Sequence, residues 1–189
     1  IDLRNRLQIV SSNGLLGFGL IFLLLMTFLN KRAGFWVALG IPFSLSVTLI
    51  VTNFMGYSIN VITLSAVIIV LGIVVDDAII VAENITKKMQ AGLPLKEAAI
   101  IGAKEVTQPI IASILATCIA FLPLLVFDGR FGSFVQVLAP VIFLMLGGSL
   151  IESLFLLPSH MTLLPYKPKK SISLFTKLEA RYTHWNTRI

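Results

Sequence analysis

Long apolar stretches alternate with short polar connections along nearly the whole chain. Five stretches match the roughly 17 to 25 residues that a helix needs to cross the hydrocarbon core of a bilayer. They occupy residues 13–29, 35–54, 61–85, 109–127 and 134–157. The pattern predicts an all-α fold, a polytopic membrane bundle of five transmembrane helices between residues 12 and 165.

The connections carry the turn residues expected between such helices. Gly56 interrupts the apolar pattern after the second span, and Gly92 and Pro94 mark a helix end and a new helix start. Residues 94–108 are expected to form a short helix on the cytoplasmic surface before the fourth span begins.

Both ends of the chain are polar. Residues 1–11 are expected to be the end of a periplasmic segment, and the start at Ile1 without a Met suggests a fragment. Residues 166–189 are a basic linker followed by an apolar stripe at helical spacing: Phe175, Leu178, Tyr182, Trp185 and Ile189. This stripe predicts an amphipathic helix in the cytoplasmic membrane interface. The alternative is a soluble helix packed on a partner domain.

The composition agrees with a membrane location. The chain is 57% hydrophobic and 13% charged, with a mean hydropathy of +0.94, whereas soluble domains carry about 25% charged residues. Its net charge of +6 comes from the connections and ends. We therefore expect membrane lipid, and no nucleic acid, as a partner.

The basic residues predict the orientation. Twelve of the 15 Lys and Arg residues follow the first, third and fifth spans, and three (Arg4, Arg6 and Arg130) lie on the opposite side. Because Lys and Arg collect in cytoplasmic loops, this bias places the N-terminus outside and the C-terminus in the cytoplasm.

Asp76 and Asp77 stand side by side in the apolar run VIIVLGIVVDDAIIVAEN of the third span. A carboxylate near the bilayer centre costs about 2.5 to 3.5 kcal/mol on insertion scales, so acidic residues at this depth indicate function by default. Two adjacent carboxylates titrate as a coupled pair. The pair is therefore a candidate proton relay, with protons as the coupling ion.

Other polar residues of the spans form a candidate accessory track. Helical geometry places Gly72, Asp76 and Glu83 on one face and Asp77 and Asn84 on the adjacent face. Ser113, Thr117 and Glu152 complete the candidate set. The alternatives are an interfacial Glu83 that reaches water, Ser and Thr hydroxyls bonded to their own helix, and a Glu152 that serves packing.

All Lys and Arg residues lie in connections or ends, and none lies within a span. Either the aspartates are protonated, or a cation reaches them from outside this sequence, and we expect the second. Cys118 is the single cysteine of the sequence, and we interpret it as a small buried hydrophobic residue. The sequence offers no metal-ligand set, cofactor motif or catalytic nucleophile, so we expect a transporter rather than an enzyme.

GIVVDDAIIVAEN at residues 72–84 resembles the fourth transmembrane helix of resistance-nodulation-division (RND) efflux transporters. The segments FLNKRAGFWVALGIPFSLSVT and GLPLKEAAIIGAKEVTQPIIASILATCIAFLPL are similar to neighbouring helices of that family. The resemblance runs from about residue 12 to residue 189. It corresponds to the second to sixth transmembrane helices and the cytoplasmic connecting helix, and the two aspartates are more like the hydrophobe and amphiphile branch.

The resemblance implies a proton/substrate antiporter of the bacterial inner membrane, with Asp76 and Asp77 as relay carboxylates. It further implies a Lys counter-charge from the second half of the transporter. A homotrimer with a periplasmic adaptor and an outer-membrane channel is the implied assembly. Two alternatives stay open: another machine of the superfamily, serving protein export or lipid transport, and a membrane scaffold without transport.

Overall fold

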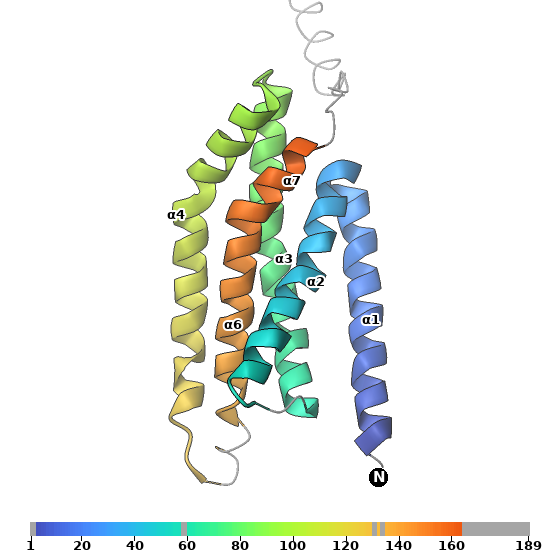
Figure 1. Cartoon of the computed structure of the whole chain (residues 1–189), viewed down its shortest axis with the longest axis vertical. Helices are drawn as coiled ribbons and strands as arrows, with labels where there is room; N and C mark the ends of the chain where they lie inside the picture. Colours follow the sequence, from blue (N-terminus) through green and yellow to red (C-terminus); the bar gives the residue numbers. More distant parts are fainter. Residues whose placement is uncertain (1–2, 58–59, 130–131, 133–134, 164–189) are drawn as a thin grey trace, which may run out of the picture.

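The computed structural model describes residues 3–57, 60–129, 132 and 135–163. In these residues every regular element is a helix, which confirms the all-α prediction (Figure 1). Five of the described helical segments are long and apolar enough to cross a membrane. The interfacial helix predicted within residues 166–189 lies outside the described residues.

The helices form one upright bundle. Along the chain they are α1 (Leu3–Phe28), α2 (Lys31–Phe54), α3 (Val61–Gln90), α4 (Leu95–Phe121), the short 3₁₀ helix η1 (Leu122–Leu125), α6 (Leu138–Ile151), the π-helical turn η2 (Glu152–Leu156) and α7 (Leu157–Leu163). α1, α3 and the continuous α6–η2–α7 rod run in one direction, and α2 and α4 run in the other (Figure 1). Helix α1 includes residues 3–11, which the sequence pattern had assigned to a polar segment before the first span.

Local chemistry defines the helix ends. The Asn60 side chain accepts hydrogen bonds from the backbone of Ile62 and Thr63, while Thr63 bonds back to the Asn60 backbone, forming a capping box before α3. Gly56 and Gly92 have φ angles of 78° and 92°, which side chains disfavour. These two glycines are the predicted breaks after α2 and α3.

The predicted surface helix at residues 94–108 is wrong as a separate element. It is the first part of α4, which continues without interruption to Phe121. Pro109 lies inside this helix, and a proline there removes one backbone hydrogen bond and bends the helix without ending it. Figure 1 shows α4 bent between its two ends.

Helix α3 is the centre of the bundle and packs against α2, α4 and α6. Small residues let the helices approach closely, as is usual between membrane helices. At Gly102 of α4, an added Cβ would lie 2.8 Å from the Ile85 Cα of α3. At the other side, Trp36 of α2 stacks on His160 of α7 with ring centroids 4.7 Å apart.

We predict that Gly102→Ala weakens the contact between α3 and α4. The new methyl group meets backbone atoms of Ile85, which cannot rotate away. Overpacking of this kind costs about 1 to 3 kcal/mol, which should lower the thermal unfolding midpoint measured in detergent. Gly19→Ala in α1 is the matched control, since no described atom lies within 4 Å of its added Cβ. Equal midpoints for the two variants would contradict the close packing.

Candidate functional site

The two adjacent aspartates of α3 point in different directions. Asp77 is 3% exposed and faces the inside of the bundle, whereas Asp76 is exposed on its surface. Successive residues on an α-helix are rotated by about 100°, so the two side chains leave the helix in different directions, and the packed face of α3 includes Asp77 but not Asp76. The pair therefore presents one carboxylate to the interior of this chain and one to its surroundings.

Asp76 belongs to a stripe of exposed residues that runs along α3 from Gly72 to Glu83. Gly72, Ile80 and Glu83 are also exposed, and Gly72, Asp76 and Glu83 have the spacing predicted for one helix face. No described atom lies within 4 Å of a Cβ added at Gly72, so space is open one turn before Asp76. A water molecule or another helix can reach the Asp76 carboxylate from this side.

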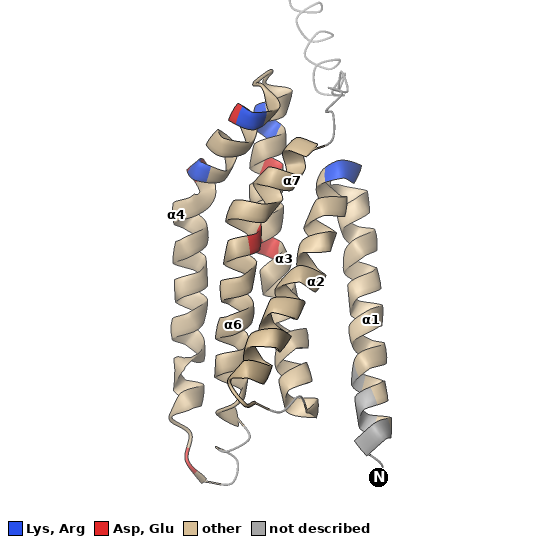
Figure 2. Cartoon of the chain, viewed as in Figure 1, with Lys and Arg blue, Asp and Glu red and all other residues tan. Residues whose placement is uncertain are grey.

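Glu152 lies at the same depth as Asp77. Ser149 of α6 donates a hydrogen bond to the Val74 carbonyl of α3, with 3.3 Å between the atoms. Asp77 comes three residues after Val74 on α3, and Glu152 comes three residues after Ser149 on the rod. Because the two helices run in the same direction, the two acids lie at the same depth. Figure 2 shows acidic positions on α3 and on the α6–η2 rod at one height near the middle of the bundle. Glu152 is 4% exposed.

Nearby serines extend the buried polar surface. Ser44 of α2 and Ser149 and Ser153 of the α6–η2 rod are all fully buried. Ser153 donates to the Leu150 carbonyl of its own helix. Ser44 is not among the residues predicted from the sequence, because one hydroxyl in an apolar helix gives no distinguishing pattern.

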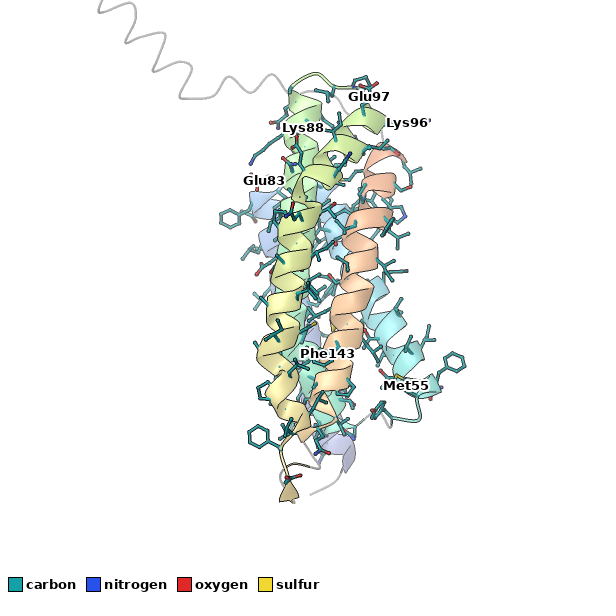
Figure 3. The ribbon with its side chains drawn as sticks, turned by 90° about the vertical axis from the view of Figure 1, so that its left-hand side faces the viewer. Met55, Glu83, Lys88, Lys96, Glu97 and Phe143 are labelled. Carbon is teal, nitrogen blue, oxygen red and sulfur yellow. The ribbon has the colours of Figure 1, made fainter. Side chains whose placement is uncertain are left out.

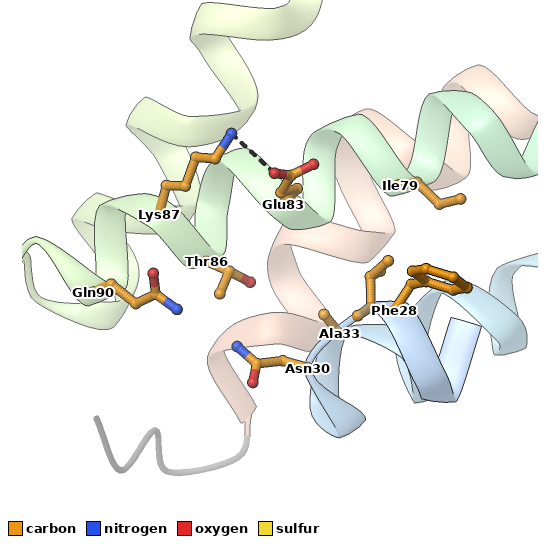
Figure 4. A pocket seen from close by; sticks show the side chains of 9 residues that line it. Phe28, Asn30, Ala33, Ile79, Glu83, Thr86, Lys87 and Gln90 are labelled. Carbon is orange, nitrogen blue, oxygen red and sulfur yellow. Dashed lines mark ion pairs between the residues drawn. The ribbon is translucent and has the colours of Figure 1, made fainter. Parts of the chain in front are cut away.

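Glu83 lies toward the C-terminal end of α3, at the end of the exposed stripe. It forms an ion pair with Lys87, one turn further along α3, with 3.0 Å between nitrogen and oxygen. Together with Phe28, Asn30 and Gln90 they line an open cleft of about 560 Å³ between α3 and the α1–α2 connection (Figure 4). Glu83 thus reaches a space that is accessible to water.

Asn84 connects α3 to α4. Its side-chain nitrogen donates to the Gly102 carbonyl at 2.8 Å and to the Glu105 carboxylate at 3.1 Å. Lys88 also binds Glu105, at 2.6 Å. Figure 3 shows Glu83, Lys88, Lys96 and Glu97 at one end of the bundle and Met55 toward the other. Asn84 thereby fixes the two helices at the end where charged residues gather.

Ser113 and Thr117 lie on α4. Ser113 is exposed and Thr117 half-buried, and the Thr117 hydroxyl donates to the Ser113 carbonyl at 3.0 Å. This is the bond to the helix's own backbone that hydroxyl groups commonly form in membrane helices. Cys118 is half-buried. Among the described residues, no group of three or more His, Cys, Asp and Glu side chains is placed to hold a metal ion.

The described cations lie toward the ends of the helices (Figure 2). The two ion pairs between described residues are Glu83–Lys87 and Lys88–Glu105. Neither includes Asp76, Asp77 or Glu152. The Asp77 Oδ2 atom is buried and has no hydrogen-bond partner in the described part of the chain. The three acids at mid-depth thus form no ion pair with a cation of the described residues.

Comparison with known proteins gives a consistent result. Residues 3–189 match the model of the AcrB/AcrD/AcrF family. The chain is 36% identical over 157 residues to multidrug resistance protein MdtC from Salmonella arizonae, covering 82% of this chain and 15% of that protein. It is 33% identical over 171 residues to MdtC from Serratia proteamaculans, covering 89% of this chain and 17% of the relative.

The chain thus spans less than a fifth of the length of these curated relatives. The family match nevertheless covers almost all of it and includes every helix described above. The chain belongs to the AcrB/AcrD/AcrF family, the RND multidrug efflux transporters.

Proposed function

We propose that the chain is the proton-coupling membrane segment of a proton/substrate antiporter, with Asp76 and Asp77 as the relay. The observation that carries the proposal is the adjacent pair itself, one carboxylate buried and the other exposed at the same depth of an apolar helix. A buried charge without a partner is costly, so each carboxylate must bind a proton or meet a cation.

The exposed Asp76 indicates where that cation comes from. Its stripe on α3 is left open by the helices of this chain, and Gly72 leaves room for a neighbour. We propose that a Lys from the second half of the same transporter approaches this face. A proton arriving at the pair neutralises the carboxylate and releases the Lys, so that proton binding changes how the two halves pack. Such a change can drive export of a substrate elsewhere in the protein.

The family match supports a proposal for the location and assembly of the complete protein. We propose that the segment lies in the bacterial inner membrane, with its N-terminal side in the periplasm and its C-terminal side in the cytoplasm. The complete protein would work as a homotrimer with a periplasmic adaptor and an outer-membrane channel. Relatives named for multidrug resistance favour drug export over protein export or lipid transport. A scaffold without transport gives no reason for an unpartnered buried carboxylate.

In the full transporter, Asp76→Asn and Asp77→Asn should each reduce proton-coupled drug efflux to the level of cells that lack the pump. An amide still forms hydrogen bonds but cannot take up and release the proton. Drug susceptibility and proton movement in vesicles that contain the purified transporter measure the effect.

Glu97→Gln is the matched control, because Glu97 is exposed on the first turn of α4 and far from mid-depth. It should leave efflux unchanged. Full resistance in both aspartate variants would overturn the relay, and a pair that only joins helices would tolerate the amides.

The orientation can be read by single-cysteine labelling in a Cys118→Ser background. Gln90 is the exposed last residue of α3, and Asp128 is exposed in the connection that follows η1, at the opposite end of the bundle. A membrane-impermeant thiol reagent should label Asp128→Cys in intact cells with a permeabilised outer membrane. It should label Gln90→Cys only in inverted vesicles. The reverse labelling pattern would show that the positive charges do not set the topology.

A further inference from the structure

We propose that Glu152 is a second proton-binding site of the transport cycle, whose charge state controls the contact between η2 and Gly40 of α2. The proposal rests on the antiport function proposed above and adds a carboxylate outside the aspartate pair. Five observations support it: burial, the glycine opposite, the register of the helices, the π-helical turn and the charges nearby.

Burial comes first. Glu152 is 4% exposed, close to the value for Asp77, although its residue type is among those least often buried without a partner. The ion pairs between described residues do not include it. An ionised carboxylate in such a place loses the solvation that water provides, and burial of a charge is costly unless it is paired. The site therefore favours a bound proton while the helices stay packed.

Gly40 makes room for this carboxyl group. A Cβ built at Gly40 would collide with the carboxyl carbon and both carboxyl oxygens of Glu152. The acid thus occupies the volume that any larger residue of α2 would fill. Closeness of this kind requires a neutral or well-solvated head group, because the glycine offers no side chain to bind a charge.

The contact belongs to a regular antiparallel register between α2 and the α6–η2–α7 rod. One turn earlier on the rod, a Cβ at Gly148 would lie 3.5 Å from the Ser44 carbonyl oxygen. Two turns later, His160 stacks on Trp36. Glu152 therefore lies between two close contacts of the rod with α2. If the rod moved away from Gly40, both of these contacts would also be disturbed.

The backbone changes its winding at this residue. The Leu157 N–H donates to the Glu152 carbonyl, five residues earlier, and residues Glu152–Leu156 form a π-helical turn. Such turns are rare and occur frequently at functional sites, because they re-aim side chains within a helix. Here the turn begins at the buried acid.

The ion pairs between described residues give Glu152 no cation as a partner. α3 presents Asp77 at the same depth, a like charge when ionised. On α2 the nearest described cation is Arg32, which donates to the Met161 carbonyl two turns from Gly40. On α7, His160 stacks on Trp36. α4 places the exposed Lys104 in a surface groove with Leu154 and Phe155, on a different side of the rod.

The test uses the full transporter in proteoliposomes, with Glu152→Gln as the variant and Glu97→Gln as the matched control. Infrared difference spectra between acidic and alkaline pH record the C=O stretch of protonated carboxyl groups. The logarithm of the transport rate is measured against pH in parallel. Glu152→Gln should remove one carboxyl band and reduce the steepest slope of that profile by about one, since one fewer proton is bound. Glu97→Gln should do neither.

Unchanged bands and an unchanged slope in Glu152→Gln would overturn the proposal. So would a loss of activity at every pH with the bands and the slope preserved, which is the result expected of a packing residue. If Glu152→Gln does not reach the membrane, Gly40→Ala decides. It keeps the acid but fills its place, so the Glu152 band must shift in frequency or titrate at a different pH, and a wild-type spectrum would overturn the inference.

Asp77→Asn, measured beside these variants, keeps the two proposals apart. Transport that survives Asp77→Asn but loses its pH dependence in Glu152→Gln would refute the aspartate relay and leave Glu152 as the proton site. Transport that is lost in Asp77→Asn but keeps its pH dependence in Glu152→Gln would support the aspartate relay and refute Glu152 as a proton site.

Discussion

The free-energy cost of placing a charge in an apolar bundle determines which states the acids of this chain can adopt. Asp76, Asp77 and Glu152 stand at one depth, and the cations of the described residues lie toward the helix ends. A soluble protein would solvate such acids or move them to the surface. In a membrane the remaining choices are a proton or a cation from another helix, and alternation between the two is what an antiporter needs. The apolar composition of the spans therefore supports the proposed chemistry as directly as the acids do.

Much of the bundle could be predicted because its signals are local. Span length and turn glycines located α2 and α3, and the capping box at Asn60 shows the local chemistry that begins α3. The spacing of Gly72, Asp76 and Glu83 placed them on one face before any neighbour was known. The error at residues 94–108 arose where two signals competed. The apolar stretch predicted as the fourth span begins at Pro109, but a membrane helix continues through a proline when neighbouring helices pack on both sides of it.

The finer structure of the site depends on contacts between distant segments, which periodicity does not record. Asn84 looked like a member of a polar track, yet in the structure it ties α3 to α4 through Gly102 and Glu105. The sequence does not distinguish Gly40 from the other small residues of α2. Its role becomes visible only in the structure, where the Glu152 carboxyl group lies against it. The π-helical turn that begins at Glu152 was likewise not predicted from the sequence pattern.

The parallel course of α3 and the α6–η2 rod has an electrical consequence. Because Asp77 and Glu152 lie at one depth, a proton that reaches either acid from the same side crosses the same fraction of the membrane potential. A full crossing by one elementary charge is worth about 2.3 kcal/mol per 100 mV. Voltage therefore cannot favour one of these acids over the other, and in the proposed cycle any order in which they bind protons must come from their immediate surroundings.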